Sequence, residues 1–124
     1  MAKSLASGGE MSVFVFGSNL AGRHGKGAAL HARQNYGAVY GKGSGPQGNS
    51  YAIPTKDEKL NSLPLEAIER YVAAFIRYAK ANQNVEFQVT RIGCGLAGYA
   101  DAQIAPMFKD APANCKLPLN WRSQ

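Results

Sequence analysis

The chain has few cysteines and no long apolar stretch, and both absences exclude classes of protein. Its two cysteines, Cys94 and Cys115, are too few for a disulfide framework, and no CxxC pair or Cys/His cluster forms a metal motif. We therefore expect no metal and no cofactor, and two buried, inert thiols in a reducing, cytoplasmic setting. Apolar runs reach only a few residues, as in Val13–Phe16, which excludes a transmembrane helix or a signal-peptide core and predicts no membrane partner.

Acidic residues are missing from most of the first half. No Asp or Glu occurs between Met11 and Lys56, whereas Arg and Lys do, and the net charge of the chain is +6. Nine of the 14 glycines fall between Gly17 and Gly48. A basic, glycine-rich segment without counter-charge favours a phosphate-bearing partner. The alternative is a solvated basic face that only keeps the protein soluble.

The length of 124 residues suits one domain with one core. Apolar residues make up 45% and charged residues 18%, as in ordinary globular proteins. Residues 1–10 are small, polar and patternless, so we expect a flexible extension or a cloning remnant there and a single domain over residues 11–124.

Strand and helix signals alternate along the first half of that domain. Ser12–Phe16 predicts a strand that is buried on both faces and ends at Gly17, and the alanine-rich segment 28–36 predicts a helix that ends at Gly37. The glycine-rich segment Tyr40–Asn49 predicts a mobile surface loop. Ser50–Pro54 predicts a second strand, ended by its proline.

The alternation continues in the second half. A helix is expected over Ser62–Asn82, capped by Ser62, with its apolar face at helical spacing. A third strand is expected over Val85–Ile92, a short helix over Asp101–Lys109, and an edge strand within Cys115–Trp121. The order predicts an α/β fold of three layers, a mostly parallel sheet with helices on both faces.

Two glycine loops follow predicted strands and lead into predicted helices. They are Gly17–Gly27 and Gly93–Gly98, and ligands of open α/β sheets bind where such loops meet helix N-termini. Glycine lets backbone N–H groups approach an anion, and the helix dipole adds attraction. Gly25-Lys-Gly27 is neither a P-loop nor a GxGxxG motif. We favour a pyrophosphate cradle over two purely structural turns.

Four segments together resemble macrodomains: Val15–Asn19, Gly25–Leu30, Ile53–Lys56 and Arg91–Leu96. They are most similar to the subgroup of ADP-ribosyl-glutamate hydrolases and antitoxins that remove ADP-ribose from DNA, and the small size also resembles bacteriophage proteins. The resemblance spans about residues 13–108. It implies a macrodomain-like fold, a ligand such as ADP-ribose or a related nucleotide, and cleavage of a glycosidic bond at the distal ribose of ADP-ribosylated DNA or protein.

The resemblance also implies roles for individual residues. Lys56 takes the place of the catalytic lysine, and Asn19 that of the residue that orients the distal ribose. The alternatives are a solvated loop lysine and a turn asparagine. The residues expected to contact the ligand are Gly17, Ser18, Asn19, Gly22, His24, Gly25, Lys26, Gly27, Ala28, Thr55, Gly93, Cys94, Gly95, Leu96, Ala97, Gly98 and Tyr99.

Some residues of the predicted site leave alternatives open. Ala97 stands where hydrolases of the subgroup carry an acid, so Asp101 is the candidate acid/base, or else a helix N-cap. His24 is either a ribose contact or a surface ring. Cys94 occupies a loop position that can lower a thiol pKa, but no His/Asn pair would make it a nucleophile. Tyr99 either stacks on a base or ribose or is half-buried.

Two functions from different classes follow. The first is an ADP-ribose-binding protein that hydrolyses ADP-ribose from a macromolecule. The alternative is a non-catalytic binder that sequesters an ADP-ribose-derived signal, as in phage counter-defence, and the absence of an acid at Ala97 favours it. A basic nucleic-acid module ranks last, because the charges follow glycine loops rather than an aromatic surface.

Overall fold

The central strand of the sheet is β1 (Met11–Asn19), in a computed structural model that describes residues 11–123. The five strands have the order β2-β3-β1-β4-β5. β1 pairs in parallel with both neighbours, β5 pairs in parallel with β4, and β2 is antiparallel to β3, so the sheet is mostly parallel as predicted. The other strands are β2 (Gly45–Gln47), β3 (Ser50–Lys56), β4 (Val85–Val89) and β5 (Cys115–Lys116).

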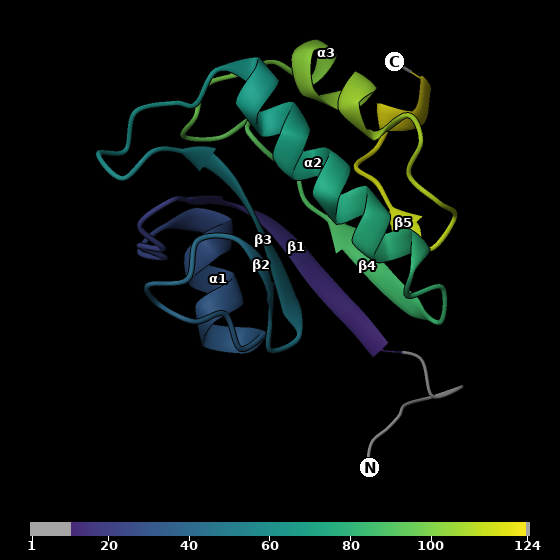
Figure 1. Ribbon diagram of the computed structural model, residues 1–124, viewed down its shortest axis with the longest axis horizontal. Helices are drawn as coiled ribbons and strands as arrows, with labels where there is room; N and C mark the ends of the chain where they lie inside the picture. Colours follow the sequence, from purple (N-terminus) through teal and green to yellow (C-terminus); the bar gives the residue numbers. More distant parts are fainter. Residues whose placement is uncertain (1–10, 124) are drawn as a thin grey trace.

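Helices cover both faces of the sheet (Figure 1), which confirms the predicted three layers. α1 (Gly27–Asn35) lies on one face. The other face carries α2 (Leu65–Lys80) and α3 (Asp101–Ile104), and the chain adds the 3-10 helices η2 (Ala105–Phe108) and η3 (Trp121–Ser123). Among residues 11–123, no helix has the length and apolarity that a membrane span needs.

Alternate side chains of β1 supply two cores, because successive residues of a strand point to opposite faces. Val13 and Val15 join the larger core with the apolar face of α2, where Phe75 is fully buried. Phe16 packs with small residues of α1, including Ala32, on the other face. The predicted apolar face of α2 is confirmed: the helix buries Ile68, Val72, Phe75, Ile76 and Ala79.

Two strands run further than their glycine and proline predicted. β1 continues past Gly17 to Asn19, and β3 continues through Pro54 to Lys56. Pro54 is tolerated because β2 pairs with β3 only as far as Ala52, so the missing N–H costs no bond to that neighbour. The extra residues bring Asn19 and Lys56 opposite each other at the carboxyl edge of the sheet.

The segment 40–49 is not the loop without regular structure that its glycines predicted. It contains β2, and the side chain of Gln47, only 4% exposed, accepts from the N–H of Val39 and donates to the carbonyl of Lys42. A Cβ on Gly43 would lie 2.1 Å from the carbonyl oxygen of Asn19. This glycine therefore allows close packing of the segment on the end of β1.

Three further helix or strand ends differ from the ends that the sequence predicts. α2 begins after Pro64, so Ser62 is not its cap; the Ser62 hydroxyl instead donates to the carbonyl of Ala97 at 2.7 Å. β4 ends at Val89 rather than Ile92. The helix predicted over Asp101–Lys109 is α3 followed by η2, where Pro106 lacks the N–H of an α-helical bond.

Candidate functional site

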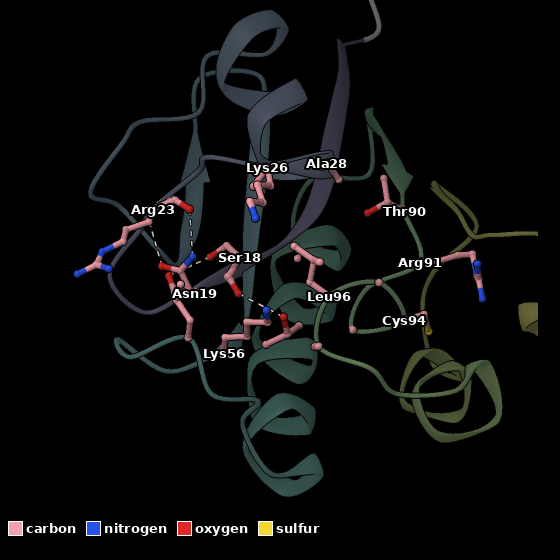
Figure 2. A pocket seen from close by; sticks show the side chains of 18 of the residues that line it. Ser18, Asn19, Arg23, Lys26, Ala28, Lys56, Thr90, Arg91, Cys94 and Leu96 are labelled. Carbon is pink, nitrogen blue, oxygen red and sulfur yellow. Dashed lines mark hydrogen bonds between the residues drawn. The ribbon is translucent and has the colours of Figure 1, made fainter.

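A cavity of about 620 Å³ lies at the carboxyl ends of β3, β1 and β4 (Figure 2). The loop after β1 forms one wall, the loop after β4 forms another, and the ends of β1 and β3 form the floor between them. Fourteen predicted site residues line it: Gly17, Ser18, Asn19, Gly25, Lys26, Gly27, Ala28, Thr55, Lys56, Gly93, Cys94, Gly95, Leu96 and Ala97. The five that do not line it are Gly22, His24, Gly98, Tyr99 and Asp101.

The N-terminus of α1 opens onto this cavity. Its N-cap, Lys26, has an extended backbone and makes no capping bond with its side chain, and the first turn holds no acidic residue. The first N–H groups of a helix have no partner within it, and they carry the positive end of the dipole. A Cβ on Gly25 would meet no atom within 4 Å. The N–H of Gly25 donates to the carbonyl of Arg23, so the donors that can reach an anion here are those of residues 26–28.

The loop after β4 is closed by its own backbone. The N–H of Gly98 donates to Gly95, and the N–H of Tyr99 donates to Gly93. Gly93 has a φ of 76° and lies against Ile104, whereas Gly95 has an ordinary φ and open space around it. Gly95 thus faces the cavity much as Gly25 does on the other side.

The charged side chains that line the cavity are all cationic: Arg23, Lys26, Lys56 and Arg91. No Asp or Glu lies among the described lining residues. Figure 2 shows Lys26 and Lys56 reaching into the cavity, while the guanidinium groups of Arg23 and Arg91 point away from it. The two lysines and the helix N-terminus make the cavity a site for an anion.

Asn19 shapes the loop that follows it. Its Oδ1 accepts from the N–H of Arg23 at 2.9 Å, and its Nδ2 donates to the carbonyl of Arg23 at 3.1 Å. The residue is the last of β1 and only 7% exposed, so the interpretation as a left-handed turn residue is wrong. One N–H and one lone pair of its amide remain for a ligand.

Asp101 is part of a structural cluster beside the cavity. Its carboxylate accepts from Arg91 at 2.8 and 3.0 Å and from the indole N–H of Trp121 at 2.7 Å. These bonds, led by those from Arg91, lower the pKa of Asp101 to about 2. Because it is ionised and outside the cavity, Asp101 does not fit the acid/base role. It is not a cap either, since Ala100 is the N-cap of α3.

The thiol of Cys94 has a raised pKa, not the lowered one that its loop position suggested. Partial burial is the main cause, and the negative charge of Asp101, whose carboxylate the sulfur approaches at 3.6 Å, adds to it. A mostly protonated thiol is a poor nucleophile, in line with the absence of a His/Asn pair.

Three more predicted contacts are structural. His24 is fully buried rather than a surface ring: its Nε2 donates to the carbonyl of Lys42 at 3.0 Å, and its ring packs on Phe16. Tyr99 is half-buried and donates its hydroxyl to Leu63 at 2.6 Å. Gly22 has a φ of 70°, and a Cβ there would lie 2.3 Å from the backbone of Gly41.

The structure adds five lining residues that sequence reasoning missed: Arg23, Ala29, Leu60, Thr90 and Arg91. Leu60 is 45% exposed, with a φ of 67°, and Leu96 is 71% exposed. The Asp57 carboxylate holds the turn before Leu60 by accepting from the N–H groups of Lys59 and Asn61, both at 2.9 Å. Asp57 is a residue type that commonly begins turns, and this is the only signal in the sequence that could have located Leu60 at the cavity.

No protein-family model matches the sequence, and neither does any curated protein. Solved structures do resemble it. A protein of unknown function from Bacteroides thetaiotaomicron has a TM-score of 0.60 at 18% identity, over 85% of this chain and 82% of its own. A macrodomain protein from Streptomyces coelicolor has a TM-score of 0.55 at 18% identity, over 89% of this chain and 84% of its own. A second Bacteroides thetaiotaomicron protein has a TM-score of 0.55 at 19% identity, over 86% and 85%. The chain therefore has a macrodomain-like fold.

Proposed function

We propose that the cavity binds ADP-ribose or a closely related nucleotide. The observation that carries the proposal is the cavity wall itself: a helix N-terminus, an opposing glycine loop and two inward lysines, with no acidic side chain among the described lining residues. Such a wall complements a pyrophosphate. The likeness to a macrodomain structure supports the same ligand class.

The strand register orients the proposed ligand. The pyrophosphate would accept from the backbone N–H groups of residues 26–28 and 95–97, because those of Gly25, Cys94 and Gly98 already donate to nearby carbonyls. The distal ribose would lie toward Asn19 and Lys56, which are register partners at the ends of β1 and β3. Asn19 would orient the ribose through its remaining N–H, because its other bonds hold the Arg23 loop.

Valine substitutions at Gly25 and Gly95 test the cradle. Both glycines have an ordinary φ and open space, so a branched side chain fits the fold yet fills the room of the phosphates. Each variant should lower the affinity for ADP-ribose in calorimetric titration by about tenfold or more. Gly27 is a poorer probe because its φ of 55° strains any larger residue.

The matched control is Ala102→Val on an exposed position of α3, which should bind as the parent protein does. Thermal unfolding of all three variants should stay close to that of the parent. Unchanged affinity in both glycine variants would contradict the cradle.

A second candidate function is removal of ADP-ribose from DNA or protein by Lys56. Its support is the lysine that reaches into the cavity beside Asn19. The Lys56 amine would attack C1″ of the distal ribose, or would stabilise C1″ while a water attacks it, as the bond from C1″ to the macromolecule breaks and the proton lost by the attacking group goes to the leaving group. If an adduct forms, water would release it from the lysine. Asp101 has no part in this scheme.

Lys56→Ala separates catalysis from sequestration. If the protein is a hydrolase, the variant should lose turnover on ADP-ribosylated DNA or protein while it keeps most of its affinity, since the amine acts mainly in the transition state. Lys80→Ala, an exposed lysine at the end of α2, is the control and should retain turnover. If the parent protein shows no turnover and Lys56→Ala binds ADP-ribose more weakly, hydrolysis is rejected. The remaining function is then a non-catalytic binder that sequesters a nucleotide signal.

A further inference from the structure

Every uncharged polar side chain that lines the cavity already bonds to the backbone. The hydroxyl of Ser18 donates to the carbonyl of Gly43, that of Thr55 to Ser18 at 3.3 Å, and that of Thr90 to Val15 at 2.7 Å. The amide of Asn19 holds both backbone groups of Arg23. These side chains build the wall, and apart from one N–H of Asn19, which the proposed arrangement places at the distal ribose, their donors are not free to recognise a ligand.

The groups of the described lining that remain available to contact a ligand are of two kinds. The lysines and the backbone N–H groups of the glycine loops suit phosphate oxygens. The rest is apolar: Ala28, Ala29, Leu60, Leu96 and Ala97. Apolar contact is non-directional, so such a surface can bind the face of a nucleobase without contacting the hydrogen-bonding groups at its edge.

Discrimination between nucleobases needs directed donors or acceptors. A site built to hydrogen-bond one group rejects an analogue without it by a large factor, whereas an apolar surface discriminates weakly. Adenine and guanine present different donors and acceptors at the same ring positions, and uracil presents a smaller ring. The described lining carries no carboxylate and no free hydroxyl donor, and its one free amide N–H, on Asn19, lies toward the distal ribose rather than the base in the proposed arrangement.

We propose that this cavity recognises the diphosphate and accepts any nucleobase, so that its ligand class is nucleoside diphosphate riboses rather than ADP-ribose alone. The inference rests on the proposed function, because it takes the diphosphate to lie between the two glycine loops. The base lies on the apolar part of the wall and contributes contact area without selectivity.

Calorimetric titration of the full chain with ADP-ribose, GDP-ribose and UDP-ribose tests the inference. The three dissociation constants should agree within about threefold. A preference of about thirtyfold or more for one base would overturn base-independent recognition and leave the proposed function intact. Failure of all three, ADP-ribose included, would overturn the proposed function and this inference with it.

Thr90→Val is the matched variant, because it removes a hydroxyl from the cavity with little change of shape. The N–H of Thr90 also donates to Val15, at 3.1 Å, so that carbonyl keeps a partner and the fold is maintained. The ratio of the affinities for ADP-ribose and GDP-ribose should stay within about twofold of that of the parent protein. A ratio that moves tenfold would show that Thr90 reads the base and would contradict the inference.

Discussion

At the scale of single residues, the side chains around the cavity are held by partners distant in the sequence. The carboxylate of Asp101 joins Arg91 at the cavity to Trp121 near the C-terminus, and the hydroxyl of Ser62 reaches the carbonyl of Ala97. Local motifs predict most of the residues that face the cavity, but they do not predict these long-range hydrogen bonds. The sequence leaves Asp101 open between an acid/base and a helix N-cap, because nothing near it indicates that Arg91 and Trp121 bond to it.

The Asp101 cluster makes stability depend on pH at the acid end. The folded-state pKa of Asp101, about 2, lies below the ordinary value of 3.8, so ionised Asp101 favours the folded state. This stabilisation is present above pH 4 and is lost as the pH falls from about 4 towards 2. Urea unfolding across this range should show the parent protein losing stability more steeply than Asp101→Asn.

At pH 7 the parent should be the more stable of the two, since the asparagine cannot pair with the Arg91 guanidinium. The difference should shrink as the pH approaches 2. Parallel curves with a constant gap would show that the Asp101 charge does not stabilise the fold. Ligand affinity at pH 7 should change little in Asp101→Asn, because this side chain does not line the cavity.

At the scale of elements, hydrophobic pattern predicted the interior of each helix and long strand better than its ends. The apolar positions of α2 and the alternation in β1 depend on periodicity, which is visible along a single chain. The ends of β1, β3 and α2 depend on neighbours: β1 and β3 extend each other by pairing, and Pro64 takes the cap of α2. The glycines of segment 40–49 predict a loop without regular structure, whereas the segment contains β2, because glycine also serves close packing.

Gly43→Ala tests the packing of that segment. Its Cβ would lie 2.1 Å from the carbonyl oxygen of Asn19, so the segment must move away from the end of β1. We expect a loss of about 1–3 kcal/mol in the free energy of unfolding, as for other overpacked sites.

Gly25→Ala is the control, because its Cβ meets no atom within 4 Å, and it should be neutral or slightly stabilising in denaturant unfolding. If Gly43→Ala unfolds at the same denaturant concentration as the parent, segment 40–49 is not packed on β1 as described.

At the scale of the whole molecule, the order of elements was sufficient to predict the layers. Alternating strand and helix signals require a mostly parallel sheet with helices on both faces, and such a sheet gathers its loops at one edge. The two glycine loops therefore share that edge, and they meet because β1 and β4 are neighbours in the sheet, with the cavity between them. Its lack of acidic lining in the described chain agrees with the absence of acids from Met11 to Lys56.

The most direct measurement is a titration of ¹⁵N-labelled protein with ADP-ribose, followed by amide chemical shifts. If the anion lies in the cradle, the largest shifts should fall on the N–H groups of Lys26, Gly27 and Ala28 after β1 and of Gly95 and Leu96 after β4. Amides of the exposed face of α2 should not move. Shifts spread over basic surface residues, with those glycine amides unchanged at saturation, would contradict the account.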